Sequence, residues 1–515
     1  MSSADLILKN ANMITVDPNR PAAELVAIKG DKILLVAGND QEESARGART
    51  KIIDCHGKTV VPSFNDAHCH IFSLVRKMLS TDLSPSSVSS ISDIKGVIRQ
   101  KAQSTPPGQW IIGTDYNDFY LAEKRHPNRR DIDEVAPHHP IVLSHRSLHA
   151  CVLNSLALSL AGITTETPEP LGGLIDRDIN TGEPTGILFE MLGYIRHKVM
   201  PPMNEAELTK GITLASQHFI SQGITSLQDA TITNEYKRWQ IYQTFMDAGK
   251  LKSRIYLMTG VELLREFQEA GLVFKSGDIH LRMGGIKIVL GEVTGQLYPP
   301  QPELNRLVFD AHRTGYQVAI HAVQPSEVEA AITALEYAYS QFPQDGQRHR
   351  IEHCSECPPG LLTRLKKLRA VVVTQPPFLY FSGERYLTTV PADRQQYLYR
   401  IKSFLKSGLV VAGSSDSPIV PDNPLIGMYA AVTRQAQSGQ QILPNECISA
   451  GQALAMYTIN AAYASCEENI KGSITQGKLA DMVVLSDDPT KVPPEQIKDI
   501  KVEMTIIGGR VVWEG

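Results

Sequence analysis

The sequence predicts an α/β fold: a TIM-like (β/α)8 barrel with a small β-sandwich built from both chain termini and a cap inserted after the first barrel strand. Three observations lead to this prediction. Apolar β-rich runs alternate with helix-like stretches through the middle of the chain, short hairpin strands occupy both ends, and one connection between predicted barrel strands is far too long for a single helix. The chain of 515 residues is long enough for such a barrel with additions.

The two ends of the chain share one pattern of short strands. Residues 1–60 contain several hairpin-like strands, and residues 470–515 contain more, with Gly508 and Gly509 as a two-residue hairpin loop. Neither end has enough strands to bury a core alone. We therefore expect 1–60 and 470–515 to form one composite β-sandwich.

The region 61–469 carries the strands expected for the barrel. Most are separated by 20–40 residues, which suits a strand, a helix and two loops, and their near-continuous apolar character is typical of a parallel sheet covered on both faces. The eight predicted strands are 59–70, 223–230, 254–258, 284–290, 316–321, 349–353, 370–375 and 409–416.

The long connection between His70 and Gly223 has strand and helix signals of its own. We expect a cap subdomain at 76–203, inserted in the barrel. Insertions after barrel strands lie on the face where barrel active sites are built, so this cap would shape a substrate pocket.

Composition and charge narrow the possible partners. The chain has 51 Lys+Arg and 55 Asp+Glu, a net charge of −4, with no basic run that would grip nucleic acid. No apolar stretch approaches the roughly 18 residues of a membrane helix, and the N-terminus does not resemble a secretory signal. The seven cysteines form no regular framework, so disulfides are not expected. We expect a cytoplasmic protein that acts on a small-molecule substrate and has no nucleic acid or membrane partner. A homodimer is one of the assembly states that the sequence leaves open.

Six side chains with metal-binding chemistry fall at the carboxyl ends of predicted barrel strands. Two of the histidines form a His-x-His pair, which places both imidazoles on the same side of an extended strand. Each residue alone has an ordinary alternative, because a strand-end His can be a core residue and a lone Lys can extend to water. The six residues are His68, His70, Lys287, His321, His353 and Asp416.

Imidazole and carboxylate ligands suit zinc or a similar divalent ion. Four imidazoles exceed what one open catalytic zinc normally takes, so either one or two ions fit this set. An ammonium beside two cations would be strongly disfavoured, whereas a carbamylated Lys287 would carry a bridging carboxylate.

Several strings resemble the metal-dependent amidohydrolase superfamily: VVPSFNDAHCH, RIEH, GSSDSP and GSITQGKLADMVVL. The inserted segment, with WIIGTDY, SHRSLHACVLNSLAL and GEPTGILFE, is similar to the YtcJ-like subgroup, which includes N-substituted formamide deformylase. The resemblance implies metal roles for the six residues above and matches the subgroup's substrate-facing cap histidine to His149.

Two departures from that subgroup lie near the expected pocket. Leu290-Gly291 stands where Asp-Gly is frequent, and Ala322-Val323-Gln324 follows His321 where Ala-x-Gly-Asp is frequent. Glu292 is the nearest acid that could replace the missing aspartate, with a solvated or structural role as the alternative.

The resulting hypothesis is a hydrolase that cleaves an amide-type C–N bond in an N-acyl, formamide or cyclic amide substrate. Metal-activated water would attack, and Asp416 would carry the proton, unless that aspartate is purely a structural ligand. A deaminase or ester hydrolase on the same metal site is an alternative, and so is a non-catalytic scaffold. Candidate substrate contacts, each with packing as the alternative, are His149, Trp110, Tyr116, Glu190, Glu292 and Phe378.

Overall fold

The computed structural model describes residues 3–170, 172–293 and 296–515, without the side chains of residues 292 and 293. The chain groups into two compact units, each described by itself below. The first unit comprises Met1–Ile71, Ala215–Glu292 and Gln296–Gly515, and the second comprises Phe72–Leu214 and Val293–Gly295. The helices α2 (Ile71–Leu79) and α7 (Glu205–Ser221) carry the chain from one unit to the other.

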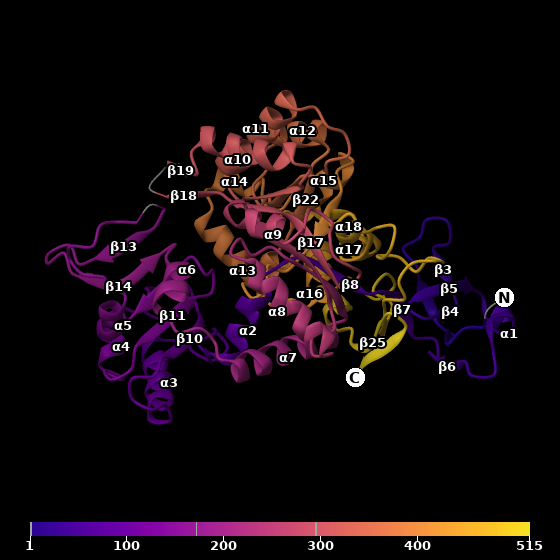
Figure 1. Ribbon diagram of the computed structural model, residues 1–515, viewed down its shortest axis with the longest axis horizontal. Coiled ribbons are helices and arrows are strands. Elements are labelled where there is room, and N and C mark those ends of the chain that lie inside the picture. The colour runs from indigo at the N-terminus through magenta and orange to yellow at the C-terminus, as the bar shows by residue number, and fades with distance from the viewer. Residues whose placement is uncertain (1–2, 171, 294–295) are drawn as a thin grey trace. The chain divides into compact units, whose positions relative to one another are not determined.

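The first unit contains a barrel of eight strands, all parallel (Figure 1). In sheet order the strands are β8 (Phe64–Cys69), β15 (Ile224–Asp229), β16 (Arg254–Gly260), β17 (Leu281–Val289), β20 (Val318–Ala322), β21 (Arg350–His353), β22 (Val371–Thr374) and β23 (Val411–Gly413). A parallel bridge between Cys69 and Ser417 brings the chain beyond β23 alongside β8. The predicted TIM-like barrel is confirmed.

Helices follow most of these strands and cover the sheet, which explains why the strands are almost entirely buried and apolar. The capping box of Gln324 and Glu327, with Pro325 in the first turn, begins the helix after β20. The helices of this unit are α1 (Glu42–Ala45), α8 (Tyr236–Asp247), α9 (Leu264–Glu269), α10 (Gln301–Arg313), α11 (Pro325–Gln341), α12 (Pro359–Leu368), α13 (Pro377–Thr389), α14 (Ala392–Gln395), α15 (Ile401–Lys406), α16 (Pro424–Thr433), α17 (Ala450–Met456) and α18 (Ile459–Ala464).

Two details of the predicted strands differ from the structure. The stretch 59–70 is two strands, because the chain leaves a different sheet at Pro62 and enters the barrel at Phe64. Ser63 makes the change of sheet, and its Oγ lies 2.5 Å from Thr225 Oγ1 on β15. The last barrel strand stops at Gly413, so Asp416 lies three residues beyond its end.

The first unit also contains two sheets near the chain ends. One has the order β5 (Lys32–Ala37), β4 (Leu25–Lys29), β1 (Leu6–Lys9), β6 (Lys51–Asp54). The other has the order β26 (Arg510–Glu514), β25 (Val502–Ile507), β24 (Met482–Leu485), β7 (Thr59–Pro62), β2 (Asn12–Ile14), β3 (Ala22–Ala23). Strands from the two ends of the chain are thus hydrogen-bonded neighbours, since β7 pairs with β24.

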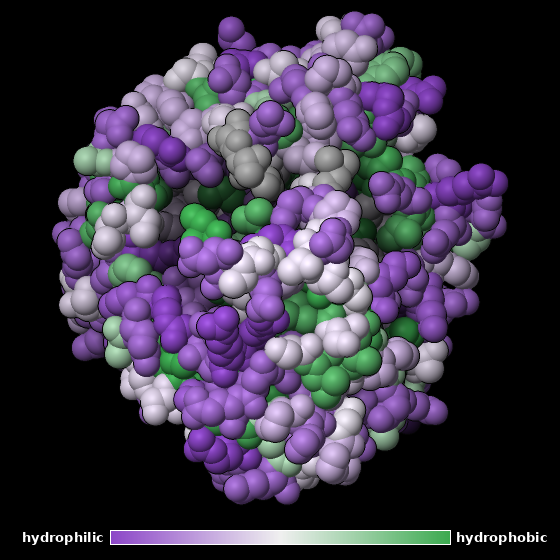
Figure 2. Space-filling view, turned by 90° about the vertical axis from the view of Figure 1, so that its left-hand side faces the viewer, coloured by the Kyte–Doolittle hydropathy of each residue, from purple (hydrophilic) through white to green (hydrophobic). Residues whose placement is uncertain are grey.

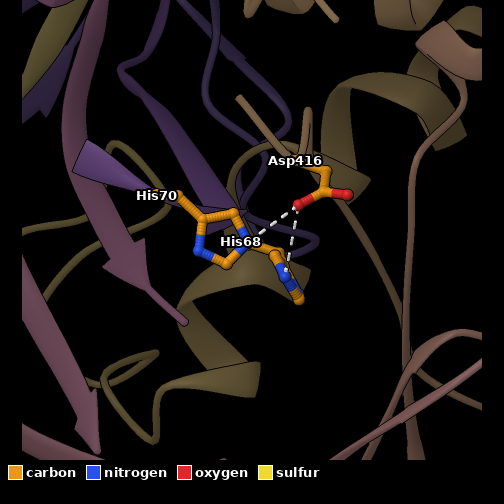
Figure 3. Close-up of side chains that lie close together, drawn as sticks. All are labelled: His68, His70 and Asp416. Atoms are coloured by element: carbon orange, nitrogen blue, oxygen red, sulfur yellow. Dashed lines mark ion pairs between the residues drawn. The ribbon is translucent and has the colours of Figure 1, made fainter. Parts of the chain in front are cut away.

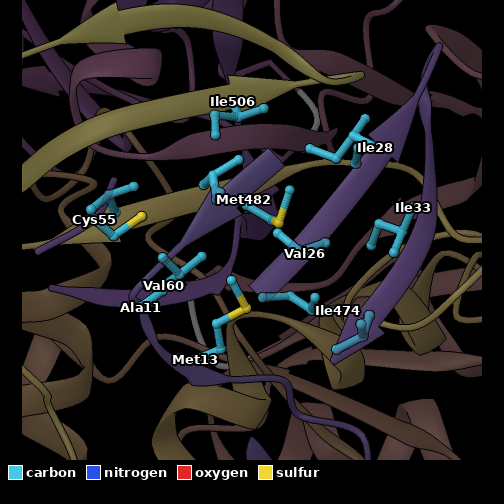
Figure 4. Close-up of a cluster of buried hydrophobic side chains, with 14 of the residues drawn as sticks. Ala11, Met13, Val26, Ile28, Ile33, Cys55, Val60, Ile474, Met482 and Ile506 are labelled. Atoms are coloured by element: carbon cyan, nitrogen blue, oxygen red, sulfur yellow. The ribbon is translucent and has the colours of Figure 1, made fainter. Parts of the chain in front are cut away.

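Side chains of both sheets meet in one apolar cluster, which includes Val26 and Ile28 from the first sheet and Met482 and Ile506 from the second (Figure 4). The predicted hairpin loop between β25 and β26 is confirmed. Gly508 and Gly509 have φ of 53° and 71°, the left-handed backbone that such a two-residue turn requires.

The second unit is built on one six-stranded sheet, in the order β13 (Leu174–Arg177), β14 (Pro184–Phe189), β12 (Ala150–Leu153), β11 (Ile141–His145), β10 (Ile111–Tyr116), β9 (Thr81–Asp82). Successive side chains point to opposite faces of a strand, and Val142 and Leu143 accordingly belong to two different apolar clusters. Both faces of this sheet are therefore buried. Its helices are α3 (Ile91–Gln103), α4 (Arg129–Asp133), α5 (Ser155–Leu160) and α6 (Leu192–Tyr194).

The face drawn in Figure 2 carries mostly hydrophilic side chains, with smaller groups of hydrophobic ones between them. Within the residues that the structure describes, no helix combines the length and the apolar character needed to cross a lipid bilayer.

Candidate metal centre

Four barrel strands bring polar side chains to one mouth, and Asp416 joins them from the segment after β23. His68 lies on β8 with His70 directly after it, and Lys287 lies near the end of β17. His321 and His353 belong to β20 and β21. Because the carboxyl ends of parallel strands meet at one end of a barrel, these residues converge although they are far apart in sequence.

Three of these side chains form a compact group, drawn in Figure 3. Ligand atoms of His68, His70 and Asp416 all lie within 4.8 Å of one another. The carboxylate oxygen Oδ1 of Asp416 lies 3.1 Å from His70 Nε2 and 3.5 Å from His68 Nε2.

The other three predicted residues adjoin this group. The ammonium of Lys287 lies 3.2 Å from His68 Nε2. The imidazole of His353 has its centroid 4.9 Å from that of His68 and 4.3 Å from that of His321. The structure thus brings all six residues of the predicted set into one continuous cluster.

Left-handed backbone occurs at two members of the cluster. The φ angles of His353 and Asp416 are 71° and 59°, and Cys354 follows with 48°. Such conformations are costly for residues other than glycine, and they concentrate at functional sites. Here they turn the ends of β21 and of the segment after β23 so that both side chains face the other histidines.

Two imidazoles have an acceptor at Nδ1. The Nδ1 of His70 lies 2.9 Å from the hydroxyl of Thr231, which itself donates to Asp229 at 2.6 Å. Because the Thr231 hydroxyl donates its proton to Asp229, its oxygen accepts the hydrogen bond from His70 Nδ1. The Nδ1 of His353 lies 2.8 Å from the amide oxygen of Gln375. Both rings consequently present Nε2, the nitrogen left to bind an ion.

The imidazole of His68 follows the same pattern with a charged partner. Its Nδ1 lies 2.5 Å from the carboxylate of Glu352, which is fully buried and ion-paired with Arg350 at 2.6 Å. The Nε2 of His68 is the atom that faces Lys287 and Asp416.

Burial shapes the charges of the cluster. It lowers the pKa of Lys287 to about 8, and together with the neighbouring ammonium it holds the pKa of His68 well below its ordinary value. Burial opposes the charge of Asp416, yet the imidazoles of His70, His68 and His353 outweigh it and hold the pKa of this carboxyl well below its usual range. A neutral His68 imidazole beside the ionised Asp416 carboxylate is the combination that a divalent cation needs.

The residues present fit a divalent metal ion. Asp416 Oδ1 is buried and has no hydrogen-bond donor within the described part of the chain. The Nε2 atoms of His70 and His68 lie 3.1 and 3.5 Å from this oxygen, and such nitrogen and oxygen donors suit zinc and related ions.

The second unit holds four of the predicted substrate contacts. His149 Nδ1 lies 2.8 Å from the carboxylate of Glu190, and both side chains are exposed. Tyr116 is fully buried, with its hydroxyl 2.9 Å from His126 Nδ1. Trp110 lines a cavity of about 480 Å³ beside the start of β10. Tyr116 is the last residue of β10, so the two side chains lie at opposite ends of this strand.

The remaining two candidates belong to other elements. Phe378 lies in the first turn of α13, and its ring centroid is 6.5 Å from that of Tyr399 within an apolar cluster. Glu292 lies in β18 (Gly291–Val293), and its side chain is outside the described residues.

Sequence reasoning missed the residues that support the histidines. Arg350 and Glu352 stand two apart in the buried strand RIEH, and this spacing could have shown that both point to the same face of the sheet. Thr231 and Gln375 carry no such signal, because the histidines that they contact belong to other strands or follow them.

Comparisons with known proteins agree with this geometry. The model of the amidohydrolase family matches residues 51–513. An N-substituted formamide deformylase from Arthrobacter pascens is 29% identical over 538 aligned residues, which cover 99% of this chain and 98% of that protein. The amidohydrolase-like protein YtcJ of Bacillus subtilis (strain 168) is 28% identical over 497 residues, which cover 92% of each chain.

Solved structures show the same architecture. The crystal structure of an uncharacterized metal-dependent hydrolase from Pyrococcus furiosus has a TM-score of 0.74 at 25% identity, over 94% of this chain and 100% of that one. A second such hydrolase, from Pyrococcus horikoshii OT3, has a TM-score of 0.76 at 23% identity, over 95% and 99% of the two chains, and shows the likeness of fold.

Proposed function

The chain belongs to the amidohydrolase family, and on that premise we propose that it is a metal-dependent hydrolase that cleaves a non-peptide, amide-type C–N bond. One observation carries the proposal: the imidazoles of His68 and His70 have partners at Nδ1 and lie with Nε2 within 3.5 Å of a buried Asp416 oxygen that lacks a hydrogen-bond donor among the described residues. That arrangement supports an ion-binding role over a packing role for the cluster.

We assign the metal to His68, His70, His321, His353 and Asp416, with zinc as the expected ion. When bound, such an ion lowers the pKa of a water toward about 7 and polarises the scissile carbonyl. Lys287 would be carbamylated, because an ammonium buried 3.2 Å from a ligand nitrogen would repel a cation there, whereas a carbamate would supply a carboxylate able to serve two ions.

Asp416 is assigned the proton transfer. Its Oδ1 is buried at the centre of the cluster and lies near two imidazoles, so it is within reach of a water molecule held there. The carboxylate accepts a proton from the attacking water and delivers it to the leaving nitrogen, which must be protonated before the C–N bond breaks.

The substrate class proposed first is an N-substituted formamide or N-acyl compound, since the Arthrobacter pascens relative is named for deformylation and aligns over nearly its whole length. For substrate contacts we retain His149, Glu190, Trp110, Tyr116, Phe378 and Glu292. The exposed His149–Glu190 pair is the strongest of these, because both groups are open to a ligand.

Activity assays on metal-defined protein test the proposal. Chelator-treated protein, and the same preparation reloaded with zinc, are incubated with N-substituted formamides, N-acyl amino acids, cyclic amides and esters. We expect release of formate or another carboxylate, with the amine, in the reloaded sample alone. Release of ammonia from amino-substituted rings would indicate a deaminase, and equal rates without metal would refute the metal mechanism.

A further inference from the structure

We propose that Glu352 is a positioning residue that fixes the tautomer of His68, so that the Nε2 of this imidazole faces the metal centre. The inference rests on the proposed function, because it concerns the same site. It adds a residue that the predicted ligand set does not contain.

The contact between the two side chains supports this role. A carboxylate paired with a guanidinium only accepts hydrogen bonds, so the proton between Glu352 Oε2 and His68 Nδ1, 2.5 Å apart, belongs to the imidazole. A neutral imidazole with its proton on Nδ1 has its lone pair on Nε2. That lone pair points to the side of the ring where Lys287 Nζ lies at 3.2 Å.

Arg350 holds the Glu352 carboxylate in place. Its Nε donates to Oε1 at 2.6 Å and its Nη2 donates to Oε2 at 3.0 Å, so both oxygens are fixed. The same Nη2 donates at 2.7 Å to the carbonyl of Ala67, the residue before His68. Nη1 donates at 2.5 Å to Gln228 on β15. The guanidinium therefore aligns the carboxylate with the backbone that carries its histidine partner.

A glutamine at position 352 would not reproduce this arrangement. Its single carbonyl oxygen has to serve either Arg350 or His68, and its amide nitrogen has to face the other. If the amide nitrogen donates to His68 Nδ1, the imidazole proton moves to Nε2 and removes the lone pair that would bind the metal. If it faces Arg350 instead, two donors oppose each other in a buried site.

Metal affinity is the direct measurement. Zinc dissociation constants are determined by competition with a chromogenic chelator for wild type, Glu352→Gln and Glu467→Gln. Glu467 is a matched control, because it is also buried and ion-paired, but with Lys471 and near Arg282, at the opposite end of β17 from Lys287. Partners that orient a ligating histidine typically change metal affinity by about 10–100-fold.

We expect a loss of that size for Glu352→Gln and wild-type affinity for Glu467→Gln. Equal affinity in wild type and Glu352→Gln would overturn the positioning role while leaving the hydrolase assignment intact. A wild-type chain that binds no metal would instead contradict the proposed function.

A second measurement needs neither a Glu352 variant nor a bound metal. In metal-free wild-type protein labelled with ¹⁵N-histidine, the signals of His68 are assigned by their loss in His68→Gln. We expect a protonated Nδ1 with a strongly downfield proton and an unprotonated Nε2. A proton on Nε2 would overturn the inference whatever the affinity data show.

Discussion

At the scale of single residues, the cluster is assembled from side chains on strained backbone. His353 and Asp416 both adopt left-handed conformations, each of which costs about 1–3 kcal/mol for a residue with a Cβ atom. The closed barrel can hold them there, because Asp416 N donates to the carbonyl of His68 at 2.8 Å and His70 N donates to that of Ser417 at 2.7 Å. The geometry of the proposed ligands is therefore imposed by neighbouring strands.

Replacement of Asp416 by Asn separates proton transfer from metal binding. Asn keeps the size and one oxygen donor but cannot take up a proton under these conditions. Because general acid–base catalysis contributes about 10²–10⁴-fold, we expect turnover to fall by at least about 10²-fold with near-normal zinc content. Steady-state kinetics and elemental analysis of the same preparation measure both. Full loss of metal would identify Asp416 as mainly a ligand, and unchanged turnover would assign the proton to another group.

The modification of Lys287 is open to direct measurement. Native mass spectrometry under carbon dioxide should show the added carbamate in wild type and not in Lys287→Ala. We also expect Lys287→Ala to lose activity and to regain part of it with short carboxylic acids, because these can occupy the space of the bridging carboxylate. An unmodified wild-type lysine in fully active protein would exclude the two-ion bridge.

At the scale of elements, a pair of buried histidines connects α10, β20 and the start of β21. Val318 N donates to His349 Nδ1 at 3.0 Å, so the other ring nitrogen of His349 carries the proton and donates to His312 Nδ1 at 2.9 Å. His312 Nε2 then donates to the carbonyl of Phe342 at 2.7 Å. This chain of hydrogen bonds needs both rings neutral, because a second proton on His349 would face the N–H of Val318.

The stability of the protein should consequently fall in acid. Burial, together with His312, lowers the pKa of His349 to about 3 from 6.5. A depressed pKa means that the stabilisation is complete above pH 6.5 and is lost as the pH falls from 6.5 toward 3, where the unfolded chain binds the additional proton. One such group changes the free energy of unfolding by up to about 1.4 kcal/mol per pH unit. Urea unfolding at several pH values should show a shallower dependence in His349→Gln; an unchanged slope would contradict this account.

At the scale of the whole first unit, one buried ion pair links the barrel to the sheet shared by the two chain ends. Arg254 on β16 binds Asp481 through two hydrogen bonds of 2.7 and 2.9 Å, and both residues are almost fully buried. Asp481 also accepts from Gly508 N at 2.7 Å, in the turn between β25 and β26. Asp481 therefore connects the barrel strand β16 with the turn between the C-terminal strands β25 and β26.

Replacement of Arg254 by Met should be strongly destabilising, because it leaves the Asp481 carboxylate buried without its partner. Breaking a buried pair in this way costs about 3–5 kcal/mol, whereas replacing both members by apolar residues is frequently close to neutral. We therefore expect a large loss in Arg254→Met and recovery of most of it when Asp481→Leu is added. Arg265→Met, on an exposed pair with Glu269, is the control and should change the unfolding midpoint in urea little. If Arg254→Met and the double variant with Asp481→Leu lost the same free energy of unfolding, the unpaired Asp481 carboxylate would not be the cause of the destabilisation.

Local sequence pattern was enough to predict the barrel and to single out the candidate ligands. Apolar strands at regular spacing predict a parallel sheet, and a His-x-His pair at a strand end places two imidazoles on one side whatever the rest of the chain does. The residues of the cluster around His68 could therefore be listed before their geometry was known.

Tertiary structure decided the features that depend on contacts between distant strands. The division of 59–70 into two strands follows from their pairing with β24 and β15, neither of which a local pattern can show. The environment of Tyr116, whose hydroxyl faces His126, was likewise invisible in sequence. The link from Arg350 through Glu352 to His68 joins residues more than 280 positions apart. Only folding brings such groups within hydrogen-bond distance, and burial then fixes which proton each of them carries.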